Sequence, residues 1–167
     1  MSIEKVNLAI KMMESTGEEI LTTGGVTSSL IQQAEQKLKI KFTEDYKYFL
    51  EKFGCLSFEG EEFYGLTRDG LNSDAIPCVI FATELARELG DISQSMVYVK
   101  SSGYGPLFSI DLSGTYSVFP VVETSLSYKR DKEVNIVAES FGDFFYNEIK
   151  DAIEDLWFYI TGSDDVL

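Results

Sequence analysis

Apolar residues in the first part of the chain recur with the spacing of helices. The first repeat, at steps of three and four residues, consists of Ile3, Val6, Ile10 and Met13. Such a repeat places one apolar stripe along a helix, so we predict a short amphipathic helix here. Residues 22–29, with the sequence TTGGVTSS, interrupt the pattern and predict a loop.

Two further helices are predicted before residue 55. Ser29 and Gln32 have the spacing of a capping box, and the apolar stripe behind them predicts a helix that ends near Lys39. Thr43 is expected to cap the next helix, which ends at Gly54, a residue type common just after helix C-termini. Its apolar face, at steps i, i+3, i+4 and i+7, comprises Tyr46, Phe49, Leu50 and Phe53. We therefore expect these side chains to face a core.

Beyond this helix the apolar pattern changes to that of extended chain. Residues 58–66 predict an extended segment with EGEE as a turn, and residues 78–81 predict a short buried strand before a helix at 82–89. Three strands rich in β-branched and aromatic residues are then predicted at 96–100, 107–112 and 115–122. Because only short turn segments separate these three strands, we expect an antiparallel meander.

The last element is predicted to be a long helix. It follows a polar, locally basic loop at 125–134, begins with Ser140 as its cap and ends at Gly162. Its apolar stripe consists of Phe141, Phe145, Ile149, Ala152, Ile153, Leu156 and Ile160. This order of elements indicates an α+β fold, in which a mainly antiparallel sheet packs with N-terminal helices and a long C-terminal helix. The length fits a single domain spanning residues 1–167.

The charge of the chain narrows its expected partners. Fourteen basic residues against 28 acidic ones give a net charge of -14. Such a field repels nucleic acids and anionic membranes and attracts cationic partners, although solubility alone is a simpler explanation. One group of acids comprises Glu59, Glu61, Glu62, Asp69 and Asp74. A second group, near the C-terminal end, comprises Asp151, Glu154, Asp155, Asp164 and Asp165.

The sequence also indicates where the protein works. No apolar run approaches the roughly 18 residues that a membrane span needs, and the first residues do not resemble a signal peptide. We therefore expect a cytoplasmic protein, with no membrane partner, in which Cys55 and Cys78 are reduced thiols.

Candidate catalytic chemistry is sparse. The chain contains no histidine, which excludes Ser-His-Asp and Cys-His arrangements, and two distant cysteines do not make a zinc site. The carboxylates of Glu59, Glu61 and Glu62 remain as conceivable Mg²⁺ ligands or paired acids, but a solvated acidic turn explains them more simply. We expect no catalytic residue, cofactor or metal.

Gly103–Pro106 is expected to be a turn, and Asp111 to accept backbone hydrogen bonds at the end of a strand.

Five segments, taken in order, resemble a known family. They are SSLIQQAEQKLKIKFTEDYKYFLEKFG, FEGEEFYGL, CVIFATELAREL, LFSIDLSGTYSVFPV and AESFGDFFYNEI. Together, over about residues 28–153, they resemble the SMI1/KNR4 superfamily, also called SUKH. The sequence departs from the family pattern at Thr43, where proline is frequent, and at Cys55, where a second glycine is frequent.

The resemblance implies an α+β domain that binds other proteins and has no catalytic residues. The resemblance further implies that bacterial members commonly look like immunity proteins against polymorphic, often nuclease, toxins, whereas eukaryotic relatives are associated with cell-wall signalling and regulation. The positions that match the family pattern are expected to be core, turn and capping residues: Tyr46, Leu50, Gly54, Gly65, Leu66, Asp111 and Phe141.

Charge and resemblance together lead to one hypothesis and two alternatives. We expect a cytoplasmic immunity protein that occludes the basic active-site cleft of a cognate toxin, most simply a nuclease. The expected contacts are Glu59, Glu61, Glu62, Asp69 and Asp74, with an exposed Phe63 or Tyr64 as aromatic anchor. One alternative is a regulatory or scaffold protein of the same family without a toxin partner. The other is a hydrolase that uses clustered carboxylates and a divalent metal.

Overall fold

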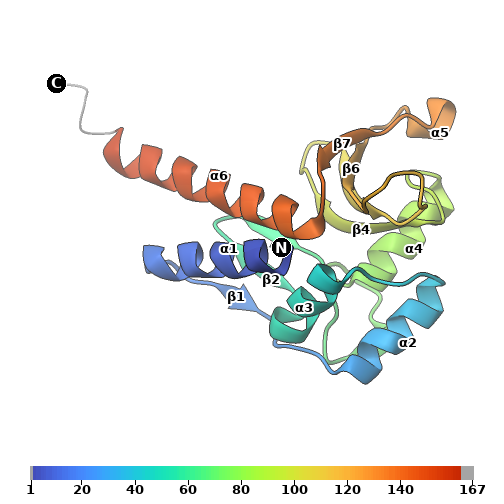
Figure 1. Ribbon diagram of the computed structural model, residues 1–167, viewed down its shortest axis with the longest axis horizontal. Helices are drawn as coiled ribbons and strands as arrows, with labels where there is room; N and C mark the ends of the chain where they lie inside the picture. Colours follow the sequence, from blue (N-terminus) through green and yellow to red (C-terminus); the bar gives the residue numbers. More distant parts are fainter. Residues whose placement is uncertain (1, 163–167) are drawn as a thin grey trace.

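A computed structural model describes residues 2–162 and has an α+β architecture (Figure 1). The helices are α1 (Ser2–Thr16), α2 (Ser28–Leu38), α3 (Glu44–Phe53), α4 (Val79–Leu89), α5 (Tyr128–Asp131) and α6 (Phe141–Thr161), with a 3₁₀ helix η1 (Gly70–Asn72). The strands are β1 (Leu21–Thr22), β2 (Leu56–Phe58), β3 (Glu61–Phe63), β4 (Met96–Ser101), β5 (Leu107–Asp111), β6 (Val121–Thr124) and β7 (Asn135–Ala138). The predicted fold class is therefore confirmed.

The strands form two antiparallel sheets. The smaller has the order β1-β2-β3, and the larger is a meander with the order β4-β5-β6-β7, as the short turns predicted. A backbone hydrogen bond of 2.8 Å from the Tyr64 N–H to the Val99 carbonyl oxygen joins the chain after β3 to β4. The two sheets are thus tied together where the hairpin β2–β3 ends.

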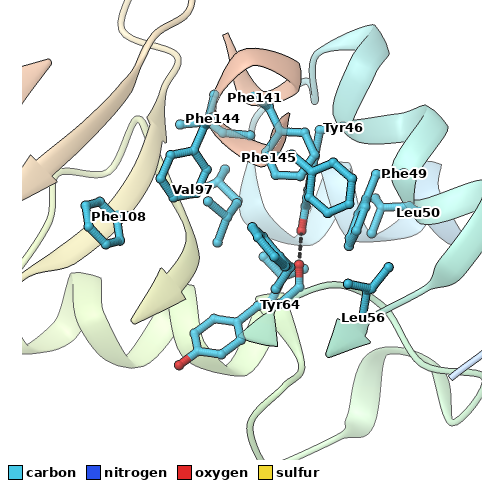
Figure 2. Packing of buried hydrophobic residues seen from close by; sticks show 14 of the residues in the cluster. Tyr46, Phe49, Leu50, Leu56, Tyr64, Val97, Phe108, Phe141, Phe144 and Phe145 are labelled. Atoms are coloured by element: carbon cyan, nitrogen blue, oxygen red, sulfur yellow. Dashed lines mark hydrogen bonds between the residues drawn. The ribbon is translucent and has the colours of Figure 1, made fainter. Parts of the chain in front are cut away.

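The main core is dominated by aromatic rings from α3, α6 and β3 (Figure 2). Tyr46 packs edge-on against Phe141 with ring centroids 4.9 Å apart, and Phe63 packs edge-on against Phe145 at 4.8 Å. Phe49 lies between these pairs, 5.3 Å from Phe141 and 5.5 Å from Phe145. The prediction that the aromatic face of α3 lies in a core is confirmed.

A smaller core lies between α4 and the larger sheet. It consists of Ala86, Ile92, Met96, Val122 and Tyr128. On the main-core side of the same sheet, Phe108 of β5 contacts Phe144 of α6, with ring centroids 5.2 Å apart. Side chains from both faces of the sheet are therefore buried, which agrees with the near-continuous burial of β4 and β6.

Helices α1 and α6 lie side by side and run in the same direction, with their first residues close together (Figure 1). A methyl group on Gly142 would lie 2.1 Å from the Ser2 carbonyl oxygen, so glycine permits the close approach of the two helix starts. Since α6 is the longer helix, its last turns project beyond the end of α1.

Several predicted helix starts are confirmed, and others differ in detail. Ser140 caps α6, accepting a 3.0 Å hydrogen bond from the Asp143 N–H. The capping box predicted at Ser29 is wrong, because Thr27 is the cap of α2 and accepts from the Leu30 N–H. Thr43 precedes α3 as predicted, but its side chain makes no capping hydrogen bond.

The predicted strands at 78–81 and 115–122 are also wrong. Residues from Val79 onward begin α4, since a short apolar run does not distinguish a strand from a buried helix. Only the last residues of the 115–122 segment belong to β6, because Pro120 has no N–H for a sheet ladder. The polar loop at 125–134 contains α5, and the strand β7 was not predicted.

Two glycines lie where backbone segments touch. A methyl group on Gly65 would lie 1.7 Å from the Gly54 carbonyl oxygen, and one on Gly25 would lie 1.9 Å from that of Glu51. Gly65 also accepts, through its carbonyl oxygen, a 2.7 Å hydrogen bond from the Val79 N–H. The loop after β3 therefore packs on the end of α3 with no space for a side chain.

We predict that Gly65→Ala destabilises the fold by about 3 kcal/mol, because the methyl group must displace backbone atoms. Gly60→Ala serves as the control. Its methyl group meets nothing within 4 Å but retains a positive φ of 82°, so we expect a loss of about 1 kcal/mol. Urea unfolding of the two variants measures both values, and equal losses would contradict the close-packing explanation.

Candidate partner-binding surface

The hairpin β2–β3 carries the first acidic group. Its two-residue turn, Glu59 and Gly60, has positive φ values of 49° and 82°, which fits the tight turns that connect twisted strands. Glu59 is exposed at this turn. Successive side chains of a strand point to opposite faces, so Glu61 shares a face with the buried Phe63, whereas Glu62 points the other way.

Glu61 belongs to a partly buried ion-pair network. The Lys100 ammonium, whose side chain is 6% exposed, lies 2.7 Å from a carboxylate oxygen of Glu61 and 3.1 Å from one of Glu148. The network joins β3, β4 and α6. Sequence reasoning missed Lys100 and Glu148, because their charges are unremarkable along the chain and only the fold brings them together.

The network shifts the pKa values of its members. Burial alone lowers the pKa of Lys100, but the hydrogen bonds and charges of Glu61 and Glu148 outweigh it and raise that pKa. Burial raises the pKa of Glu148, and the nearby lysine counteracts only part of that shift. The Lys100 ammonium thus forms ion pairs with two carboxylates, and these pairs stabilise the charged form of the lysine.

The predicted aromatic anchors are not exposed, and this expectation was wrong. Phe63 is fully buried among the rings of α3 and α6, and Tyr64 is 4% exposed. The Tyr64 ring packs edge-on against Tyr98 at 5.1 Å, and burial raises the pKa of its hydroxyl. Alternation within β3 directs Phe63 inward, whereas Tyr64, which follows the strand, is covered where its backbone joins β4 and its ring packs on Tyr98.

Asp69 and Asp74 flank η1 on a different part of the surface. Both are exposed, and their loop is held to α2 by a 3.3 Å hydrogen bond from the Lys37 ammonium to the Leu71 carbonyl oxygen. The structure therefore does not gather the predicted contact residues into one cluster: Glu61 is tied to Lys100, and the hairpin acids lie apart from the η1 loop.

The second acidic group continues from the hairpin along α6. Glu148 of the network is followed on this helix by the exposed carboxylates of Asp151, Glu154 and Asp155. Asp151 contributes to the raised pKa of Glu148, which indicates that their charges act on one another. Asp164 and Asp165 lie outside the described residues. Glu61 of the hairpin is thus linked through Lys100 to Glu148, and the exposed acids of α6 follow from there along the helix.

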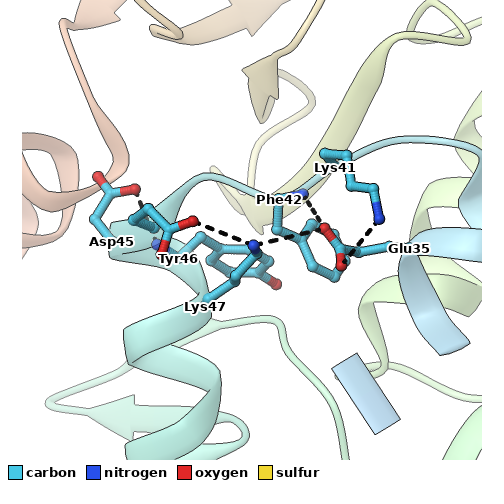
Figure 3. Close-up of polar contacts among 7 residues, drawn as sticks. Glu35, Lys41, Phe42, Asp45, Tyr46 and Lys47 are labelled. Atoms are coloured by element: carbon cyan, nitrogen blue, oxygen red, sulfur yellow. Dashed lines mark hydrogen bonds and ion pairs between the residues drawn. The ribbon is translucent and has the colours of Figure 1, made fainter. Parts of the chain in front are cut away.

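Two buried carboxylates have structural partners (Figure 3). Glu35 accepts a 2.8 Å hydrogen bond from the Phe42 N–H and lies 3.8 Å from the Lys41 ammonium. Asp45 accepts 2.9 Å and 2.8 Å hydrogen bonds from the N–H groups of Tyr46 and Gly142. Each therefore satisfies backbone donors, one in the α2–α3 loop and one at the start of α6.

The described surface has several hollows, of about 140 to 440 Å³. A hollow of about 140 Å³ lies beside Glu62, lined largely by apolar groups of Leu21, Cys55, Leu56 and Pro77. Cys55 and Cys78 are free and buried. In the part of the chain that the structure describes, no three His, Cys, Asp or Glu side chains gather to hold a metal ion.

None of the helices within residues 2–162 combines the length and apolar character needed to cross a membrane.

Comparison with known proteins identifies the family. A family model described as SMI1-KNR4 cell-wall matches residues 28–145, more than half of the chain. The chain therefore belongs to the SMI1/KNR4, or SUKH, superfamily, and the two antiparallel sheets with the long final helix agree with this fold. A search of curated proteins finds no match for the chain.

We predict that Asp45→Ala lowers the free energy of unfolding by about 1–3 kcal/mol, because the buried Gly142 N–H loses its acceptor. The control is Glu44→Ala in the same helical turn, where the carboxylate is 83% exposed and a change within about 0.5 kcal/mol is expected. Chemical denaturation measures both. A neutral Asp45→Ala would show that this hydrogen bond does not hold α6 in place.

We predict opposite outcomes for two adjacent charge reversals. Glu61→Lys places a second cation beside the buried Lys100 and is expected to cost about 1–3 kcal/mol, since a partly buried pair is broken. Glu62→Lys changes an exposed side chain, and we expect a change within about 0.5 kcal/mol. Thermal unfolding of the two variants measures the difference, and similar melting temperatures would refute the role of the network.

Proposed function

We propose that this chain is a bacterial, cytoplasmic immunity protein that binds and neutralises a cognate toxin without catalysis of its own. The observation that carries the proposal is the combination of SUKH family membership with a net charge of -14 and with exposed carboxylates on the hairpin, the η1 loop and α6. Membership of the family supports an immunity-protein-like role in general. The acidic exterior narrows the class of toxin to one with a basic active site.

The electrostatic mechanism follows from what a nuclease needs. Its cleft must be cationic to hold phosphate groups, so an anionic protein surface competes for the same groups. Complementary charge accelerates encounter and discourages wrong partners. Bound there, the protein excludes the nucleic acid by occupying the cleft.

The docking residues we propose are the acids of the hairpin and of the η1 loop. Glu59 and Glu62 are exposed at the hairpin, and Asp69 and Asp74 are exposed beside η1. Glu61 contributes chiefly by pairing with Lys100, which fixes the hairpin against α6. We therefore assign direct contact with the toxin to the exposed Glu59 and Glu62 of the hairpin and not to Glu61.

One observation favours a second candidate function. The description of the matching family model names the cell wall, and this fits a regulatory or scaffold protein without a toxin partner. The two functions differ in gene neighbourhood. An immunity gene is expected beside a gene whose product ends in a toxin domain, and a regulatory gene is not.

The proposed function can be tested with the toxin domain encoded by the neighbouring gene. We predict that co-expression of this chain rescues cells from that domain, and that the purified pair associates at a rate that falls about tenfold or more between low and physiological salt. Glu62→Lys should slow association several-fold, whereas Glu133→Lys, an equal charge change on the exposed segment after α5, should have little effect. Toxicity that persists during co-expression would refute the proposed function.

A further inference from the structure

The C-terminal turns of α6 expose large apolar side chains, three of them aromatic. Trp157, Phe158, Tyr159 and Ile160, which we call the α6 tip, are 57%, 75%, 83% and 56% exposed. The buried stripe of the helix ends at Ile153. Large apolar groups exposed together on a charged protein commonly mark a site of protein association.

The cause of this exposure is geometric. Helix α1 covers the first turns of α6 and ends at Thr16, so the later turns of α6 extend past it (Figure 1). Consecutive residues of a helix point about 100° apart, so the four residues of the α6 tip surround the helix axis. A flat surface would cover only one or two of them. A concave groove is needed to cover them together.

We propose that the α6 tip inserts into an apolar groove on the cationic partner and supplies the aromatic anchor of the complex. The proposal rests on the function proposed above and names the part of the surface that carries affinity. Binding energy at protein interfaces concentrates in a few buried aromatic residues, with Trp and Tyr prominent among them. The tip replaces Phe63 and Tyr64, which are buried and unavailable for this role.

The charges around the tip specify the chemistry of the groove. Asp151, Glu154 and Asp155 are exposed on the preceding turns, and Glu154 makes a loose ion pair with Lys150 at 3.8 Å. A partner that covers the tip must therefore lie against carboxylates. Lysine or arginine side chains on the rim of the groove satisfy this condition.

One lysine links the acids of α6 to the hairpin. Glu148 of α6 and Glu61 of β3 share the Lys100 ammonium, so the two elements are fixed side by side. A single basic partner that holds the tip can thus also contact the exposed acids of the hairpin. The tip would supply affinity, and the hairpin acids would supply association rate and selectivity.

A second copy of this chain fits the tip less well. Three fully covered aromatic side chains bury about 450–750 Å², which is less than the roughly 800 Å² per partner of a standard interface. A dimer through the tip would need the neighbouring surface as well. That surface is acidic in both copies, and each chain carries a net charge of -14, so the charges would repel.

The test uses Trp157, the single tryptophan of the chain, as a local reporter. Full-length protein labelled with 5-fluorotryptophan gives one ¹⁹F resonance, and adding the neighbouring gene's toxin domain should shift it and protect the indole from solvent. Phe158→Ser combined with Tyr159→Ser should weaken binding at least tenfold without lowering the melting temperature. The control, Tyr104→Ser, removes a 78% exposed aromatic from the β4–β5 loop and should leave affinity unchanged.

The outcomes separate this inference from the proposed function. Wild-type binding with an unshifted ¹⁹F signal, or full affinity in the double variant, would overturn the anchor and leave the immunity function standing. A wild-type protein that does not bind the toxin domain would overturn the function itself. A ¹⁹F shift that depends on the concentration of this chain alone would assign the tip to a second copy and overturn the basic partner.

Discussion

The structure depends on two adjacent side chains at the start of α3 that reach across the molecule in different directions. The Asp45 carboxylate accepts the backbone N–H of Gly142 and so holds the start of α6. The Tyr46 hydroxyl donates a 2.8 Å hydrogen bond to the Tyr64 carbonyl oxygen at the end of the hairpin (Figure 2). Both side chains are buried, where an unpaired polar group is costly, so these bonds specify how the two elements lie relative to α3.

The positions of the acidic side chains on the surface follow from these buried hydrogen bonds. With α6 and the hairpin both held on α3, Lys100 lies within reach of a carboxylate from each, and the acids beyond them fall on neighbouring surfaces. The spacing of these surface charges is therefore fixed before a partner binds. Such preorganisation reduces the ordering cost of binding.

The sequence predicted features that local spacing determines and missed those that need distant contacts. The core face of α3, including Tyr46, and the Ser140 cap follow from helical periodicity and capping chemistry, and both are present. Phe63 and Tyr64 were expected outside because charges surround them, but packing on α6 buries Phe63 and packing on Tyr98 of β4 buries Tyr64. The pairing of Lys100 was not predictable, because its partners lie on two elements far away along the chain. The exposure of the α6 tip depends on where α1 ends, and no pattern within α6 reveals this.

The pairing of α1 with α6 has a consequence for how the protein is made. Helix α1, with its buried Val6, Ala9 and Met13, is synthesised before α6, yet α6, on which it packs most extensively, leaves the ribosome only after the strands between them have been translated. Until then only α3 is present to cover part of that apolar stripe, and exposed apolar surface favours aggregation and engagement by chaperones. The long sequence separation of this contact also slows folding. Closure of the two helices is accordingly a late event in biosynthesis.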